Sequence, residues 1–294
     1  MYKNIFINCS GSNIYSTLGA LDRLNDRLKN ITIWNVTGSA SLILFFKLLG
    51  FTPKQTFDRL KNFELANTLI NGHSLFPEDE DAKKSYIKKY LENFFTDSLL
   101  KADCTLKNVE NLTGITPCFI VWNRKLKKIQ NITPHDFPEY HLLDTVMATL
   151  TNIGVYKEYT IFRNIYSSLE SIDAYPLEYA YYTHIEDFLY FFNISEYIKE
   201  YIIENNLGPL KSVEDEFLLQ KCENNDYRLK KLIKTLPDSK NIFKIYSIYS
   251  RGNSKEEEKA SLFILGHRQA SGFLENKSTY LVYKDYLDSV YRQS

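Results

Sequence analysis

The chain has 294 residues, of which 44% are hydrophobic and 24% are charged, a composition typical of a globular protein with a sizeable core. Its 36 basic residues balance its 36 acidic residues, so we expect no overall electrostatic field that would steer the protein to nucleic acid or to acidic lipid. The sequence has no apolar run near the length of about 18 residues that a membrane-spanning helix needs, and it opens without a secretory signal pattern. We therefore expect a cytoplasmic protein that is not transmembrane.

Residue usage adds two expectations. The 22 Tyr and 19 Phe, together with abundant Asn, Ile and Lys, are typical of an AT-rich genome such as that of a large DNA virus, which would place the protein in the host cytoplasm or the virion. The five histidines and four cysteines lack metal-ligand spacing, so we expect reduced thiols, no metal and no cofactor. The cysteines are Cys9, Cys104, Cys118 and Cys222.

The first half of the chain alternates between predicted strands and helices. A strand near 3–8 precedes a helix near 13–29 that keeps one apolar face. A second strand, near 31–36, leads into a helix near 40–49, and Thr52 is predicted to cap the helix after that. Such alternation predicts a mainly parallel sheet with helices on both faces.

The alternation continues past residue 80, and the chain is predicted to become largely helical from about residue 177. A helix near 83–98 and a buried strand at 116–122 come first, followed by a basic stretch at 124–128 that we interpret as an exposed hairpin turn. Helices are expected from about 177 onward. The further elements predicted there are helical stretches at 179–204 and 213–235, a strand at 261–265 and a last helix near 278–292.

A serine lies where the second strand meets its helix, within Thr37-Gly38-Ser39-Ala40-Ser41. α/β hydrolases present a nucleophilic serine on such a turn, with a glycine two residues before it and another two after it. Here Thr37 and Ser41 occupy those two positions. Ser39 is therefore a candidate nucleophile, and the alternative is an ordinary helix N-cap.

Four stretches, in this order, resemble the patatin-like phospholipase family over about residues 3–178. They are Asn8-Cys9-Ser10-Gly11-Ser12-Asn13 with Leu18-Gly19-Ala20-Leu21, the serine turn with Gly50-Phe51-Thr52-Pro53, Leu143 to Thr149 with Ile153 to Tyr156, and Tyr166 to Leu177. The resemblance implies a three-layer α/β fold with a mainly parallel central sheet, and a catalytic Ser–Asp dyad served by a glycine-rich oxyanion loop. It leaves 179–294 as a mostly helical extension packed on the 1–178 core as a single structural unit.

The chain departs from the family pattern at the positions that carry the chemistry. Ser168 occupies the place of the dyad aspartate, and Gly11 alone remains of the glycine run in the first loop. At the serine turn, counting back from Gly50 selects Gly38, whereas local composition selects Ser39. A serine without a base is a poor nucleophile, so these losses bear directly on activity.

Two functions follow from the resemblance. The first is a catalytically degenerate patatin-like protein that binds a protein partner or serves as a scaffold and keeps an acyl chain in the old pocket. The alternative is an active acyl hydrolase with Ser39 as nucleophile, Asp173 as base, and the backbone amides of Gly11 and Ser12 as oxyanion donors. Asp173 would reach that role only if its loop shifts by five residues; otherwise it initiates a turn.

Overall fold

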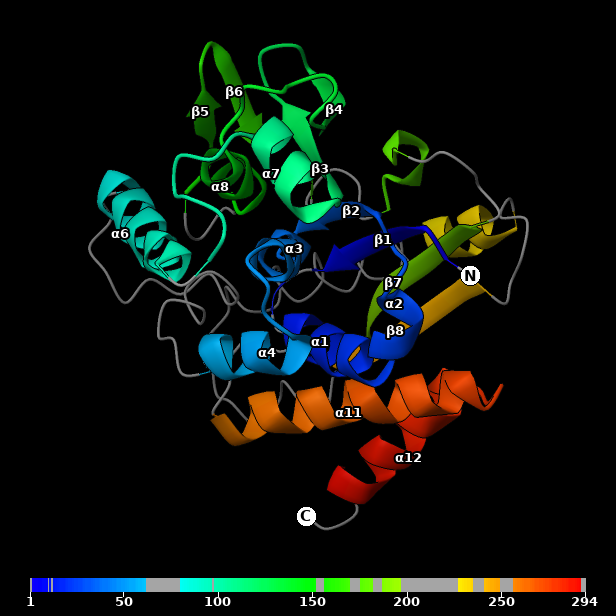
Figure 1. Cartoon of the computed structure of the whole chain (residues 1–294). Coiled ribbons are helices and arrows are strands. Elements are labelled where there is room, and N and C mark those ends of the chain that lie inside the picture. Colours follow the sequence, from blue (N-terminus) through cyan, green and yellow to red (C-terminus); the bar gives the residue numbers. More distant parts are fainter. Residues whose placement is uncertain are drawn as a thin grey trace, which may run out of the picture.

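A computed structural model describes the ten segments 2–9, 13–61, 80–96, 98–151, 156–169, 175–181, 187–196, 227–234, 241–248 and 256–291, together with residue 11. Figure 1 shows a central sheet with most helices gathered against it. No helix among these residues is long and apolar enough to cross a membrane.

The described strands form one eight-stranded sheet in the order β5-β6-β3-β2-β1-β7-β8, with β4 paired to β3 (Figure 1). The five strands from β3 to β8 along this order are parallel, and the hairpin strands β4, β5 and β6 are antiparallel to their neighbours. The strands are β1 (Asn4–Cys9), β2 (Ile33–Gly38), β3 (Thr116–Asn123), β4 (Lys128–Ile132), β5 (Tyr159–Ile161), β6 (Asn164–Ser167), β7 (Phe188–Glu196) and β8 (Ile242–Ile248). The predicted α/β class with a mainly parallel sheet is confirmed.

The central strands are buried on both faces. Every residue of β1 and of β2 is buried, which is why apolar residues such as Ile5, Phe6 and Ile7 follow one another and do not alternate with exposed polar ones. Ile5, Ile7 and Val36 belong to the large core on one face, and Phe6 belongs to a smaller core on the opposite face. The sheet is therefore a middle layer.

Helices pack on the large-core face. Figure 1 shows α1 and α4 lying between the sheet and α11, with α12 beyond. The helices of this layer are α1 (Asn13–Arg23), α2 (Asn25–Leu28), α3 (Ala40–Leu48), α4 (Pro53–Lys61), α11 (Glu256–Leu274) and α12 (Thr279–Tyr291). α1 and α11 cross at glycines: a Cβ on Gly19 would lie 1.9 Å from the Phe263 carbonyl oxygen, and one on Gly266 would lie 1.8 Å from that of Ser16.

A second group of helices surrounds β3 and the hairpins. These are α6 (Glu80–Glu92), the 3₁₀ turn Asn93–Phe95, α7 (Leu106–Thr113) and α8 (Leu142–Thr149). α7 shows why such segments form helices, because Thr105 caps its first turn and Gly114 ends it in the left-handed conformation.

The opposite face of the sheet carries the smaller core. There Tyr190 and Phe192 of β7 pack with residues of 175–181, which holds the short 3₁₀ turn Leu177–Tyr179, and with Leu229 of a helical segment at 227–233. Helices and turns on both faces complete the predicted three layers.

Two predictions for the back half are wrong at the level of single elements. Residues 188–196, predicted to be helical, form β7, and this strand pairs in parallel with β1. Residues 261–265, predicted to be a strand, lie inside α11, whose acidic first turn favours a helix. In the predicted helix 213–235, only 227–234 is described, and it is helical.

Several predicted elements of the first half are confirmed. The strands near 3–8 and 31–36 and the helix near 40–49 are present as β1, β2 and α3. Thr52 Oγ1 accepts a hydrogen bond from the Gln55 backbone N–H at 3.2 Å, and Gln55 Oε1 accepts one from the Thr52 backbone N–H at 2.9 Å. This reciprocal capping fixes the start of α4.

Candidate functional site

The loop after β1 and the turn after β2 lie side by side. Cys9 pairs with Gly38 in the sheet register, and the backbone N–H of Ser39 donates to the Cys9 carbonyl at 3.0 Å. In open α/β sheets, ligands bind outside the carboxyl ends of the strands. We therefore take the loop 9–13 and the turn 37–41 as the candidate site. The turn 37–41 is called the elbow from here on.

The sharp bend of the elbow falls on Gly38. Its φ is 58°, in the left-handed region that glycine enters without strain. Ser39 follows with φ −64° and ψ −16°, an ordinary helical conformation. The residue with positive φ in this strand-to-helix turn is thus the glycine. The serine is already the N-cap of α3.

The Ser39 side chain is buried, with 7% of the residue exposed. It stands at the N-cap position of α3 but makes no capping hydrogen bond. Within the part of the chain that the structure describes, no carboxylate hydrogen bonds to its hydroxyl. Ser41, in contrast, donates from Oγ to the Gly38 carbonyl at 2.8 Å, and the Thr37 hydroxyl is buried with no partner among the described atoms.

Of the remaining candidate residues, the structure describes Gly11 and Ser168 but not Ser12 and Asp173. Gly11 has φ 52°, and its carbonyl accepts from the Ile14 backbone at 3.4 Å. Ser168 is buried after β6, where its backbone N–H hydrogen bonds to the Thr151 hydroxyl. Ser12 and Asp173 lie outside the described residues, so the proposed oxyanion pair and the Ser–Asp dyad stay predictions.

A buried amide pair next to the loop was not anticipated from the sequence. Asn193 of β7 donates its backbone N–H to Asn8 Oδ1 at 3.0 Å, and its side-chain amide donates to the Asn8 carbonyl. Thr17 Oγ1 is 3.0 Å from Asn193 Oδ1, and the Tyr175 hydroxyl donates to the Asn193 carbonyl at 3.1 Å. Asn193 was missed because its segment was predicted to be helical.

The same network reaches β8 and the start of α1. Ser247 donates its hydroxyl to Asn13 Oδ1, and Thr17 donates to the Asn13 carbonyl at 2.8 Å. Cys9 Sγ lies 3.8 Å from Thr17 Oγ1. The network consists of amides and hydroxyls, which are neutral at every ordinary pH, and of one thiol. None of these groups is a carboxylate that could act as a base.

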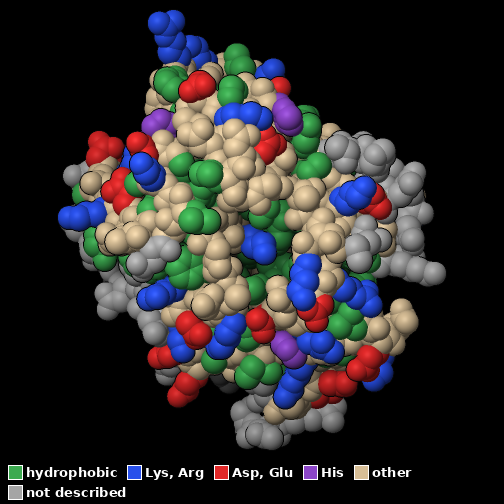
Figure 2. All heavy atoms as spheres, in the orientation of Figure 1, with side chains coloured by type: hydrophobic (Ala, Val, Ile, Leu, Met, Phe, Trp, Pro, Cys, Tyr) green, Lys and Arg blue, Asp and Glu red, His purple; other side chains and the backbone are tan. Residues whose placement is uncertain are grey.

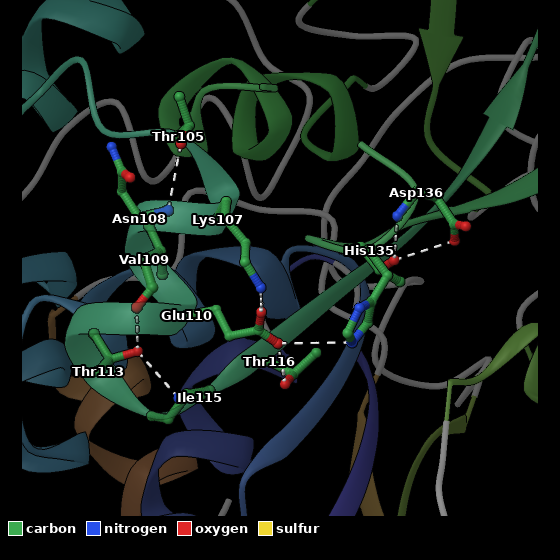
Figure 3. Close-up of polar contacts among 11 residues, drawn as sticks. Thr105, Lys107, Asn108, Val109, Glu110, Thr113, Ile115, Thr116, His135 and Asp136 are labelled. Carbon is green, nitrogen blue, oxygen red and sulfur yellow. Dashed lines mark hydrogen bonds and ion pairs between the residues drawn. The ribbon is translucent and has the colours of Figure 1, made fainter. Parts of the chain in front are cut away.

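A second polar cluster lies at the other end of β3 (Figure 3). Glu110 of α7 accepts from Lys107 at 2.8 Å and from Thr116 at 2.7 Å, and His135 Nε2 is 3.8 Å from the same carboxylate. Partial burial opposes ionisation, but the hydrogen bonds from Lys107 and Thr116 outweigh it and lower the pKa of Glu110. Nowhere in the described ranges do three or more His, Cys, Asp or Glu side chains converge as metal ligands.

This second cluster helps to hold the segment 175–181 on the sheet. The His135 ring lies 5.5 Å from the Tyr181 ring. Asn35 of β2 accepts from the Tyr181 backbone N–H at 2.6 Å and donates to its carbonyl at 2.9 Å. The segment that follows the predicted dyad loop is therefore tied to a central strand by two amide hydrogen bonds.

No protein-family model matches the chain, and no curated protein matches its sequence. Among solved structures, VipD from Legionella pneumophila is similar with a TM-score of 0.54 and 12% identity over 94% of this chain and 67% of VipD. The type III effector ExoU is similar with a TM-score of 0.49 and 10% identity over 94% of this chain and 53% of ExoU.

A third similar structure is full-length ExoU with SpcU from the type III secretion system of Pseudomonas aeruginosa. Its TM-score is 0.43 and its identity 9%, over 81% of this chain and 53% of the solved one. The chain thus spans about half to two thirds of the solved chains that it matches. At 12% identity the likeness to VipD concerns architecture alone, and together with the strand order above it identifies the patatin-like α/β fold.

Proposed function

We propose that this protein is a catalytically degenerate patatin-like protein that acts by binding and not by hydrolysis. The observation that carries the proposal is the position of the bend. Gly38 occupies the strained turn on which a hydrolase presents its nucleophile, and glycine has no hydroxyl to present. Ser39, one residue later, has the backbone of a helix start.

The surroundings of Ser39 support the same proposal. A serine attacks an ester only when a base accepts its proton. Its hydroxyl meets no carboxylate among the described residues, and the network that ends at Asn8 and Asn193 consists of neutral groups. Ser168, in the place of the family's aspartate by sequence resemblance, cannot act as a carboxylate base.

The expected size of the loss is large. Removal of a catalytic base typically costs several orders of magnitude in rate, and removal of one oxyanion donor costs about 10²–10³. A fold that keeps its core while losing both has its function elsewhere, in surface contacts. We propose a protein partner, with an acyl chain held in the former substrate pocket.

We also keep the two-part organisation as a proposal. Residues 1–178 would form the patatin-like core, and 179–294 would add helices to it. The later part also supplies β7 and β8 to the sheet, which supports a single structural unit.

Labelling by a fluorophosphonate probe tests the proposal, because the probe reacts with activated serines. The full chain is incubated with the probe and its intact mass is measured, beside Ser39→Ala. We expect no adduct on either protein, while an active serine hydrolase in the same buffer is fully labelled.

One result would contradict the proposal. It is an adduct on the wild type that is lost in both Ser39→Ala and Asp173→Asn, since this would establish the dyad of the alternative function. Circular dichroism of each variant shows that the compared proteins are folded.

A further inference from the structure

Two hairpin tips lie together at one end of the molecule. β3 pairs with both β4 and β6, so the turn at 124–128 and the turn at 162–163 are neighbours. Lys125 Nζ donates to the Arg163 carbonyl across the two tips at 3.4 Å. We call residues 124–128 with 162 and 163 the hairpin surface.

The hairpin surface is strongly basic in a chain whose net charge is zero. All of its cations are exposed, namely Arg124, Lys125, Lys127, Lys128 and Arg163. Arg124 pairs with Glu158 at 2.8 Å. Among the described residues, the other four have no ion-pair partner. Figure 2 shows Lys and Arg side chains beside hydrophobic ones over the end where β4, β5 and β6 lie.

Two large apolar side chains stand among these cations. Phe162 is 69% exposed and Leu126 is 52% exposed. Phe162 is not loose, because its ring rests 5.4 Å from the Tyr140 ring at an interplanar angle of 41°. The phenyl ring thus contacts the Tyr140 ring on one side, while most of the residue is exposed to solvent.

Backbone conformation gives an independent reason to regard this surface as functional. Three non-glycine residues in the described ranges have positive φ, and two of them are Lys127 at 49° and Phe162 at 50°. Glycine or asparagine would relieve this strain, and a bulky residue there is a genuine outlier. Strained residues of this kind cluster at functional surfaces.

The hairpin surface lies at the same edge of the sheet as the elbow. β2 and β3 are parallel with Val36 opposite Phe119; β2 ends two residues later at Gly38, and β3 continues for four residues to Asn123. At roughly 3.3 Å per residue, the end of β3 at Asn123 projects about 7 Å beyond the end of β2, and the hairpin surface begins with the next residue. The hairpin surface and the candidate site therefore both lie at the edge of the sheet where β2 and β3 end.

We propose that the hairpin surface docks the protein on a membrane that carries anionic lipid. Unpaired Lys and Arg side chains bind anionic headgroups, and an exposed aromatic ring enters the boundary between headgroups and acyl chains. A flat anionic layer fits the two tips, which present charge and apolar area together. This inference goes beyond the proposed function and does not depend on whether Ser39 is catalytic.

Vesicle sedimentation of the full chain tests the charge contribution. We expect the protein to pellet with phosphatidylcholine vesicles that contain phosphatidylserine, to stay in solution with phosphatidylcholine alone, and to be released by salt. Each cation near the surface contributes roughly fivefold to partitioning, so Lys125→Ala with Lys127→Ala lowers the partition coefficient roughly 30-fold. The matched control, Lys231→Ala with Lys234→Ala in the described segment 227–234, leaves it unchanged.

Phe162→Asn separates binding from folding. Asparagine accepts positive φ, so the thermal midpoint stays the same or rises, whereas vesicle partitioning falls about tenfold with the loss of the ring. Leu281→Asn, at a position 62% exposed on α12, changes neither binding nor its salt dependence.

Three results would overturn the inference. The first is failure of the wild type to pellet with anionic vesicles, and the second is equal binding by the wild type and the hairpin variants. The third is retention on DNA without vesicle binding, which would assign the cations to nucleic acid. None of these readouts measures ester hydrolysis, so they are distinct from a failure of the proposed function.

Discussion

Ser39 and Gly38 divide between them two properties that a hydrolase combines in one residue. Gly38 has the bend, and Ser39 has the hydroxyl. The Ser39 hydroxyl is buried and makes no hydrogen bond to the described residues, and such a hydroxyl contributes little to stability. The role of Ser39 in folding can therefore be separated from any role in chemistry.

The first prediction concerns helix caps. Ser39→Ala changes the free energy of unfolding by less than about 0.5 kcal/mol, because its side chain makes no cap bond. Thr105→Ala, which loses the hydrogen bond to the Asn108 backbone, costs about 1 kcal/mol. Urea unfolding followed by circular dichroism measures both, and an equal cost for the two variants would contradict the geometry of the elbow.

A second prediction at this scale concerns the amide pair. Asn193→Ala removes the side-chain amide that hydrogen bonds to the Asn8 carbonyl and to the Thr17 hydroxyl in a buried site, so it costs about 2–4 kcal/mol. Asn108→Ala on the exposed face of α7 serves as the control and costs less than about 0.5 kcal/mol. A small effect of Asn193→Ala on the urea midpoint would mean that the network does not hold the loop after β1.

Sequence reasoning located the candidate site but not its detailed geometry. β-branched and aromatic residues before Thr37, and a buried helix after Ser41, place the elbow at the end of a strand. The choice between Gly38 and Ser39 at the bend needs a backbone angle, which composition does not determine. Asn193 belongs to a contact between strands 185 residues apart in the chain, which no local pattern encodes.

At the scale of elements, the crossing of α1 and α11 depends on two glycines. An added methyl group at Gly19 or Gly266 would overlap a backbone carbonyl of the partner helix, which cannot rotate away. Gly272 lies in the same helix α11, but a Cβ there would meet a side-chain methyl group of Val282 at 3.0 Å and no backbone atom of the partner helix. The three glycines therefore allow a matched comparison.

The third prediction follows from that comparison. Gly19→Ala and Gly266→Ala each lower the free energy of unfolding by about 1–3 kcal/mol, since the helices must separate. Gly272→Ala is neutral or stabilises by up to about 1 kcal/mol, because alanine is the better helix former. Thermal unfolding ranks the three, and a stabilised Gly266→Ala protein would show that the helices are farther apart than the structure has them.

Element prediction failed where tertiary contacts override local pattern. The run Phe188 to Phe192 was assigned to a helix because aromatic residues recur densely around it. A short unbroken apolar run is equally typical of a buried parallel strand, and it becomes one here because β1 offers a parallel edge. Ser261 to Leu265 has strand-like composition, but an acidic first turn and 19 residues of helix determine its conformation.

At the scale of the whole molecule, two buried cysteine thiols make the stability of the protein depend on pH in the alkaline range. Burial, chiefly by desolvation, raises the pKa of the Cys118 thiol to about 12 and that of the Cys104 thiol to about 11. In the unfolded chain thiols ionise near pH 8.5. The native state therefore keeps protons that the unfolded state releases, and stability falls as the pH rises.

The fourth prediction gives this effect a window. The contribution of both thiols is fully present below about pH 8.5 and is lost as the pH climbs toward about 11 to 12. Urea midpoints across this range should decline, and Cys118→Ala should make the decline shallower. A midpoint that is flat or rises with pH would contradict the burial of these thiols.

For the whole molecule, we propose that the elbow of this patatin-like fold lacks a working nucleophile and that the hairpin tips dock on a membrane. The central claim is the absence of hydrolysis. The most direct test is fatty-acid release from phospholipid vesicles containing phosphatidylserine, measured for the wild type and Ser39→Ala. We predict that both proteins release fatty acid no faster than buffer does; turnover by the wild type that disappears in Ser39→Ala would contradict the account.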